Sequence, residues 1–249
     1  MKKRLFFHTL SDLNGKGDLI LIALSDRLQA VASLIPTCKC AADVGTDHGY
    51  LAVWLLQNRK AAHVFATDIH AGPLSRAKQT ASEQDCADRM TFHLCDGLQF
   101  PDAEQADAVI LAGMGGETMI SILQEAPWSW SGTALILQPQ SKQELLFQWL
   151  REHGIGLIEA KLCADAGKLY LALLARGGAD TSVTAEDLLM SAQDALLPRY
   201  LEEEINRIER AEAGALQSRR ELKFQHDAWR ERKQYLAAYQ EVVKNDNRS

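Results

Sequence analysis

The sequence predicts an α/β fold, in which a mostly parallel, Rossmann-like sheet is covered by helices on both faces and followed by a helical appendage. Two observations favour this class. Short apolar runs alternate with helical stretches of ten or so residues up to about residue 174, as in chains whose parallel strands are joined by helices. Beyond about residue 184 the chain becomes highly charged, and its apolar residues recur every three or four positions. A chain of 249 residues can hold one large domain, or a smaller one with an appendage.

The first predicted element is a capped amphipathic helix over 25–35, which Pro36 ends. The elements that follow alternate strictly. Apolar runs predict strands over 41–44, 63–68, 90–95, 106–112 and 133–137, and the segments between them predict helices over 50–56, 72–84, 119–123 and 142–153.

Two further strands are expected over 156–160 and 168–174, with too few residues between them for a helix. They should therefore pair antiparallel. Five parallel strands that end in an antiparallel pair describe the sheet of class I methyltransferases better than that of a dehydrogenase.

The turn after the first strand reads DVGTDHG over 43–49. Its glycines permit a tight turn and a close approach of a ligand to the backbone. The pattern departs from the dinucleotide fingerprint G-x-G-x-x-G, because Asp47 stands where that site needs a glycine near the pyrophosphate. A carboxylate there repels phosphate and suits a cationic cofactor, such as the sulfonium and ammonium of S-adenosylmethionine. The alternative is an ordinary βα turn of another α/β protein.

Acidic and small residues also follow the later strands. Asp68 ends the second strand, 25 positions after Asp43, which is near the spacing expected of a ribose-binding carboxylate. Asp96 and Gly97 follow the third strand, and a glycine-rich run over 113–116 follows the fourth. Ligands of parallel α/β sheets bind at the carboxyl ends of the strands, so these residues are candidates for one common site.

Two helices of about 20 residues, folded back as a hairpin, are expected in the appendage. One apolar stripe comprises Leu197, Leu201, Ile205, Ile208, Ala211 and Ala215, and a second comprises Trp229, Leu236, Tyr239 and Val243. Between 219 and 233 basic residues outnumber acidic ones. This run is either a solvated helix face or an edge that contacts phosphates.

The bulk composition is that of a soluble globular protein, with 47% hydrophobic and 24% charged residues. The net charge of −6 means that any nucleic-acid binding needs a local basic face. An odd number of cysteines, five, argues against a disulfide scaffold and for reduced thiols in the cytoplasm. The apolar run over 19–24 is too short for a membrane span, and no secretory cleavage site is evident. The seven histidines show no metal-ligand spacing, so no metal site is expected.

Six stretches together resemble the TrmK family of bacterial tRNA methyltransferases: LSDRL (24–28), ADVGTDHGYL (42–51), DGL (96–98), AGMGG (112–116), ILQPQ (136–140) and GKLY (167–170). The resemblance covers about 24–249. It departs from the family pattern at Ala52, where a proline is common, and at Gln140, where an asparagine is common.

The resemblance implies methylation of N1 of the adenosine at tRNA position 22, with S-adenosylmethionine as cofactor, tRNA as partner and a monomeric enzyme. It implies an N-terminal extension over 1–23, a class I methyltransferase domain over 24–178 and a helical coiled-coil domain over 184–249. The basic run over 219–233 in the appendage argues against the alternative of a small-molecule methyltransferase. The acids of the strand ends argue against a second alternative, a non-catalytic RNA-binding protein on this fold.

Asp47 is the catalytic candidate, since a carboxylate near N1 or the N6 amino group would stabilise the developing positive charge, and the family's matching Asp is thought essential. The alternative is that Asp47 only caps the following helix. The predicted cofactor-binding residues are Asp43, Gly45, Asp47, His48, Tyr50, Asp68, Ile69, Asp96, Gly97, Ala112, Gly113 and Met114. The predicted substrate-binding residues are Arg27, Gly115, Gly116, Gln138, Pro139, Arg219, Arg220, Lys223 and Arg230.

Overall fold

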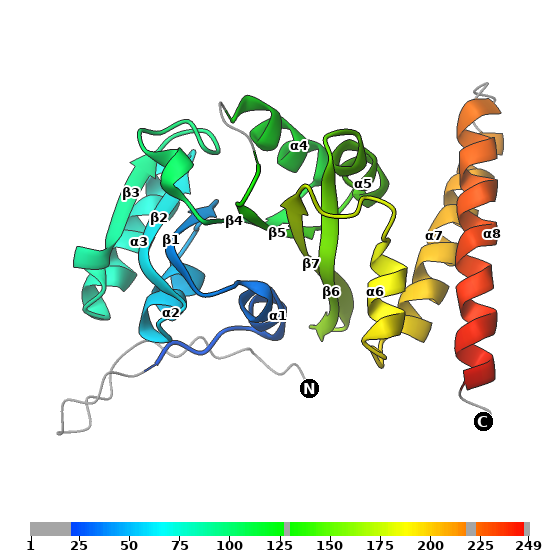
Figure 1. Ribbon diagram of the computed structural model, residues 1–249, viewed down its shortest axis with the longest axis horizontal. Coiled ribbons are helices and arrows are strands. Elements are labelled where there is room, and N and C mark those ends of the chain that lie inside the picture. Colours follow the sequence, from blue (N-terminus) through cyan, green and yellow to red (C-terminus); the bar gives the residue numbers. More distant parts are fainter. Residues whose placement is uncertain (1–20, 127–129, 218–222, 247–249) are drawn as a thin grey trace.

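The computed structural model describes residues 21–126, 130–217 and 223–246, without the side chains of 215–229 and 246. A seven-stranded sheet in the order β3-β2-β1-β4-β5-β7-β6 forms its centre, with helices packed on both faces (Figure 1). The strands are β1 (Cys38–Val44), β2 (Ala61–Asp68), β3 (Met90–Leu94), β4 (Ala108–Met114), β5 (Ala134–Pro139), β6 (Ile155–Asp165) and β7 (Lys168–Gly177). All seven predicted strands are present.

Strands β1 to β5 pair in parallel, and β7 pairs antiparallel with both β5 and β6. The predicted antiparallel end pair is therefore confirmed. The sequence left open which of the two strands joins the parallel sheet. Strand β7 does so because all of its residues over 171–175 are buried, as an inner strand requires. Strand β6 alternates buried and exposed residues and takes the edge.

The helices that cover the sheet are α1 (Asp26–Leu34), α2 (Tyr50–Gln57), α3 (Ala71–Glu83), α4 (Gly116–Glu125) and α5 (Gln143–Glu152), with short 3₁₀ turns η1 (Ala87–Arg89) and η2 (Ala103–Gln105). Ser25 caps α1 by accepting a hydrogen bond from the Leu28 N–H. The core forms two layers, because successive residues of β4 face opposite sides of the sheet. Val109 and Leu111 belong to one apolar cluster and Ala108 and Ile110 to the other.

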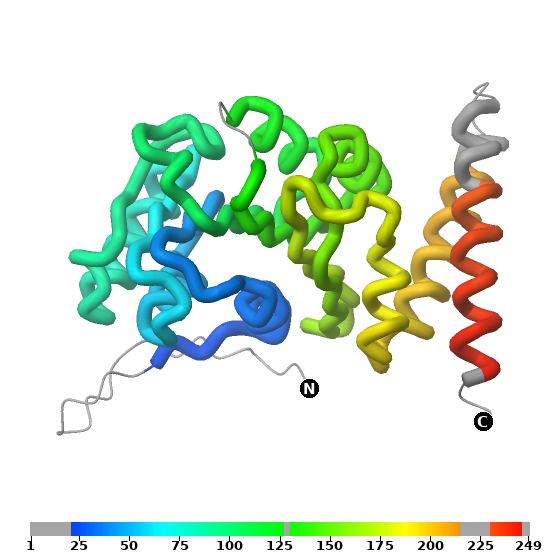
Figure 2. The backbone as a smooth tube through the Cα atoms, viewed as in Figure 1, coloured from blue at the N-terminus to red at the C-terminus, as the bar shows by residue number. Residues whose placement is uncertain are grey.

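The appendage contains α6 (Ala185–Ser191), α7 (Leu197–Gln217) and α8 (Lys223–Asp246). Helix α8 runs back beside α7, as predicted, on the far side of β6 from the rest of the sheet (Figures 1 and 2). The buried residues of the predicted stripes are Leu197, Leu201, Ile208 and Leu236, which continue one cluster of the sheet's core. Ala211 is exposed, a correction to the first stripe, and the side chains of Ala215 and Trp229 lie outside the described residues. The short helix α6 was not predicted from the sequence.

All five cysteines are free thiols. Burial raises the pKa of Cys38 and of Cys40 to about 11, so both thiols stay protonated at neutral pH. None of the described helices combines the length and the apolar character that crossing a membrane requires.

Candidate active site

The carboxyl ends of β1 to β5 lie at one edge of the sheet, and this edge collects most of the predicted site residues. Asp43 lies in β1, Asp68 ends β2, and Asp96 follows β3. Ala112, Gly113 and Met114 end β4, and Gln138 and Pro139 end β5. Arg27, in the first turn of α1, reaches the same edge, because its guanidinium donates to the Gln138 side chain.

The turn after β1 is held by hydrogen bonds to β2. The Gly45 and Thr46 N–H groups both donate to the Thr67 carbonyl, at 2.8 and 3.0 Å. Gly49 has a φ of +72°, and a Cβ on it would lie 3.0 Å from the Ala77 Cβ of α3. The glycine therefore allows α3 to pack directly against the turn.

Asp43 is a buried carboxyl group, 4% exposed, whose Oδ2 accepts a hydrogen bond from the Thr46 hydroxyl at 2.8 Å. Burial raises its pKa to about 6, the Thr46 hydrogen bond opposes this rise, and the nearby Asp68 charge adds to it. A buried carboxylate with a raised pKa is stabilised by a bound cation. Asp43 is thus suited to a positively charged ligand.

Cofactor affinity is expected to depend on the charge of Asp43. Because its pKa in the folded protein is about 6, above the ordinary value of 3.8, its contribution to stability is present below pH 3.8 and is lost as the pH rises through 6. A cationic cofactor prefers the ionised form. Its dissociation constant, measured by calorimetry, should rise about tenfold between pH 7 and pH 5. Asp43→Asn should abolish this dependence, and an unchanged slope in that variant would refute the assignment.

Asp47 has a φ of +50° and makes an ion pair with Arg76 of α3, at 2.8 Å from Oδ1 to Nη2. Its side chain is 63% exposed, and the His48 ring lies 3.8 Å from the same oxygen. Helix α2 begins after Gly49, with no side-chain capping bond, so Asp47 does not cap it. Arg76 was not predicted as a site residue, because no local pattern links two residues that meet only when α3 packs on the β1 turn.

His48 and Tyr50 stack beside Asp47, with ring centroids 5.3 Å apart and nearly parallel planes. Both side chains remain partly open to solvent. They form an aromatic wall next to the β1 turn.

The ends of β2 and β3 are joined by a hydrogen bond from the Cys95 N–H to the Asp68 carbonyl. Asp68 Oδ1 accepts from the His70 N–H at 2.8 Å, and Oδ2 has no partner among the described residues. Ile69 is 58% exposed, which leaves an apolar side chain open beside Asp68. Asp96 is exposed, and the Gly97 carbonyl accepts from the Thr67 hydroxyl. These ends therefore offer a carboxylate oxygen, an apolar surface and a second acid.

The turns after β4 and β5 are locked together. The Gln140 N–H donates to the Met114 carbonyl at 2.9 Å, and the Gly116 N–H donates to the Ser141 carbonyl at 2.8 Å. A Cβ on Gly116 would lie only 2.4 Å from the Lys142 carbonyl oxygen. The close approach of the two turns therefore requires a glycine at 116. Gly115 is the N-cap of α4.

Gly116→Ala is expected to push these turns apart, because the added methyl group meets backbone and not a flexible side chain. Overpacking of this kind costs about 1–3 kcal/mol of unfolding free energy. Denaturant melts should show that loss. Gly214→Ala is the control, because Gly214, like Gly116, has no positive φ, and nothing lies within 4 Å of its Cβ. Equal losses in both variants would contradict the close-packing argument.

The Arg27 guanidinium lies beside Gly113 at the carboxyl edge of the sheet. Its Nη1 donates to Gln138 Oε1 at 2.9 Å, and a Cβ on Gly113 would lie 3.3 Å from that nitrogen. The guanidinium also lies over the Tyr170 ring, at 5.9 Å from its centroid. The Arg27 N–H donates to Asp165, which ties α1 to the β6–β7 hairpin. Asp165 and Tyr170 were not predicted as site residues.

Of the four substrate residues predicted in the appendage, the structure describes the side chain of one, Arg230. Arg219, Arg220 and the Lys223 side chain lie outside the described residues, and Arg230 is exposed on α8. Two further cations of this run, Arg232 and Lys233, form ion pairs within the protein. Within the described ranges, no three His, Cys, Asp or Glu side chains are grouped to hold a metal ion.

The sheet order and the acids at its carboxyl edge define an S-adenosylmethionine-dependent methyltransferase. A family model described as a methyltransferase domain matches residues 24–173, from the start of α1 into β7. The match includes every predicted site residue outside the appendage.

The particular family follows from individual relatives. The chain is 33% identical to the tRNA (adenine(22)-N(1))-methyltransferase of Bacillus subtilis (strain 168), over 69% of this chain and 72% of that protein. The crystal structure of the B. subtilis m1A22 tRNA methyltransferase TrmK superposes with a TM-score of 0.70 at 26% identity, covering 90% of this chain and 98% of that one. A Streptococcus pneumoniae protein in complex with S-adenosyl-L-methionine superposes with a TM-score of 0.69 at 25% identity, covering 90% and 99%. The chain belongs to the TrmK family of tRNA (adenine(22)-N1)-methyltransferases.

Proposed function

We propose that the protein transfers a methyl group from S-adenosylmethionine to N1 of the adenosine at position 22 of tRNA. The match to the B. subtilis tRNA (adenine(22)-N(1))-methyltransferase carries this proposal. The four acids of the carboxyl edge and the partly exposed residues 113–115 after β4 support it, because they suit a cationic nucleoside cofactor and a flat base.

The edge offers each part of the cofactor a matching group. The free Oδ2 of Asp68 is available to the ribose hydroxyls, and Asp96 to the adenine amino group. Ile69 supplies an apolar surface for the adenine ring. Asp43 and the β1 turn, with Gly45, His48 and Tyr50, face the cationic methionine end. The cofactor supplies an activated methyl group on a sulfonium.

The methyl acceptor is proposed to bind between the β4 and β5 ends. Gly113 and Gly115 are partly exposed and leave the backbone open to an adenine ring. Gly116, predicted as a substrate residue, is instead buried against the Lys142 carbonyl. Gln138 and Pro139 are also buried, and Gln138 holds Arg27 beside Gly113. Arg27 is placed to meet the phosphate or ribose of the target nucleotide. N1 carries its own lone pair, so no strong general base is needed, and alignment of N1 with the methyl group is the main requirement. Asp47 is proposed to stabilise the positive charge that develops on the ring.

The direct test is methyl transfer from labelled S-adenosylmethionine to unmodified bacterial tRNA, with nucleoside mass spectrometry of the product. We expect 1-methyladenosine that disappears when position 22 is changed. Methylation of another RNA or of a small molecule would keep the enzyme class and replace the substrate. Cofactor binding without any transfer would favour a non-catalytic RNA-binding role.

A tRNA substrate and five free thiols favour a cytoplasmic enzyme. The family resemblance favours a monomer, which sedimentation of the full chain would test. Residues 1–23 are proposed as an extension that precedes the methyltransferase domain of 24–178, with the helical domain of 184–249 as a tRNA-contacting arm.

A further inference from the structure

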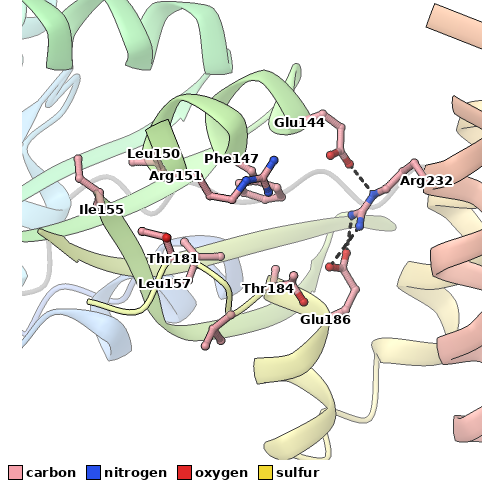
Figure 3. A pocket seen from close by; sticks show the side chains of 12 residues that line it. Glu144, Phe147, Leu150, Arg151, Ile155, Leu157, Thr181, Thr184, Glu186 and Arg232 are labelled. Carbon is pink, nitrogen blue, oxygen red and sulfur yellow. Dashed lines mark hydrogen bonds and ion pairs between the residues drawn. The ribbon is translucent and has the colours of Figure 1, made fainter. Parts of the chain in front are cut away.

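One face of α8 attaches the appendage to the methyltransferase sheet. Arg232, Tyr235 and Tyr239 follow each other at helical spacing, and each makes polar contacts outside the α7–α8 hairpin. Their partners lie at the beginning of α5 and in the first turn of α6. Figure 3 shows Arg232 reaching from α8 between Glu144 and Glu186.

Arg232 is the centre of this attachment. Its Nη2 lies 2.6 Å from Glu186 Oε1, and its Nε lies 2.8 Å from Glu144 Oε1. The side chains of Glu186 and Arg232 are only 1% and 17% exposed. Burial alone disfavours the charged guanidinium, but Glu186 and Glu144 outweigh it and raise the pKa of Arg232. The cation therefore stays charged and bound to two different helices.

Two tyrosines extend the contact along α8. The Tyr235 hydroxyl lies 2.9 Å from the Thr184 hydroxyl, and the Tyr239 hydroxyl donates to Asp187. Thr184 and Asp187 are also the two members of the capping box that begins α6. The face of α8 thus binds the capped first turn of α6, the next helix after β7.

The start of α7 is tied to the acceptor side of the site. Arg199 Nη2 donates to the Gly167 carbonyl in the β6–β7 turn at 3.0 Å. Asp165, two residues earlier, accepts from the N–H of Arg27, whose guanidinium borders Gly113. A change in the orientation of the α7–α8 hairpin would therefore shift the β6–β7 turn and Arg27, beside which the target base is proposed to bind.

We propose that Arg232 is a positioning residue, whose ion pairs with Glu186 and Glu144 fix the α7–α8 hairpin relative to the catalytic edge so that one tRNA contacts both. This inference rests on the proposed function. Apolar burial between α8 and the core is non-directional, whereas charged hydrogen bonds to two helices fix the orientation of the α7–α8 hairpin relative to the sheet. Buried ion pairs add little net stability, so the role of the Arg232–Glu186 pair is better explained by the orientation that it imposes on the hairpin.

The experiment compares three variants of the full chain. Arg232→Met and Glu186→Gln each break the central ion pair but change the net charge in opposite directions. Lys233→Met is the matched control, because Lys233 is adjacent on α8 and its partners, Glu209 and Glu212, lie on α7 within the hairpin. Each variant is assayed for kcat/KM with tRNA, for the cofactor dissociation constant by calorimetry, and for shape by small-angle X-ray scattering without RNA.

We expect kcat/KM to fall by about tenfold or more in Arg232→Met and Glu186→Gln, a change of about 1.4 kcal/mol in transition-state stabilisation. The cofactor dissociation constant should not change, the distance distribution from scattering should broaden, and Lys233→Met should behave as the native protein. Arg232→Lys should recover part of the rate, since it keeps the charge but loses the bidentate geometry.

Equal losses in Arg232→Met and Lys233→Met, with a gain in Glu186→Gln, would overturn the proposal in favour of simple attraction between cations and RNA. So would native kinetics and scattering in a folded Arg232→Met protein. Should Glu186→Gln fail to fold, Glu144→Gln replaces it, because Glu144 is 44% exposed. A native protein that binds cofactor but methylates no tRNA would refute the proposed function alone, and the scattering comparison would still decide whether Arg232 fixes the hairpin.

Discussion

Asp47→Ala is expected to lower kcat for tRNA methylation by about 10²- to 10³-fold, the range found when one charge-stabilising group is removed from an active site. The physical reason is that methylation turns a neutral adenine into a cation, and the Asp47 carboxylate is the exposed negative charge on the β1 turn. Cofactor affinity should change little. Single-turnover rates at saturating cofactor and tRNA would measure the effect.

Arg76→Met is the control for Asp47. It removes the partner that holds the carboxylate at 2.8 Å but leaves the carboxylate itself in place. If Asp47 acts by its charge, Arg76→Met should keep most of the turnover. Full activity of Asp47→Ala, or a loss confined to cofactor binding, would show that Asp47 is not the catalytic group.

Asp68→Ala is expected to weaken cofactor binding by on the order of 10²- to 10⁴-fold, because hydrogen bonds to a charged group contribute about 1.5–3 kcal/mol each and two ribose hydroxyls are involved. Calorimetric titration with S-adenosylhomocysteine measures this without turnover. The same result is expected with S-adenosylmethionine, because the two ligands share the ribose.

Two further variants separate ribose binding from other effects of Asp68. Asp68→Asn keeps an acceptor for the His70 N–H but cannot accept from both hydroxyls, so it should lose most of the affinity as well. Asp88→Ala removes an exposed carboxylate in η1, before β3 and away from the carboxyl edge, and should bind normally. Normal binding by both Asp68 variants would rule out the ribose contact.

The class of fold and the location of the site were predictable from local sequence. Alternating apolar runs and helical segments specify strand and helix because burial requires that periodicity. The carboxyl ends of parallel strands meet at one edge whatever the order of the strands. Asp43, Asp68 and Asp96 could therefore be grouped before their neighbours in the sheet were known.

The placement of β7 between β5 and β6 was not predictable from the spacing of the two strands. Either strand could have paired with β5 through the same tight turn. The choice depends on burial of both faces of β7. Ala172 and Leu174 share a cluster with residues of α1, whereas Leu171 and Leu173 join the cluster on the other face, so this burial arises only when the helices have packed on the sheet. Likewise the short helix α6 is stabilised by a capping box whose hydroxyl group contacts Tyr235 of α8.

The sequence by itself determined the order of the elements, the acidic β1 turn and the set of residues at the carboxyl edge, because each depends on neighbours along the chain. Only the tertiary structure decided which partners these residues have. Arg76 meets Asp47 across 29 positions, Arg27 meets Gln138 across 111, and Arg232 meets Glu186 across 46. Such contacts depend on how whole helices pack, and packing is a property of the assembled core that local periodicity does not encode.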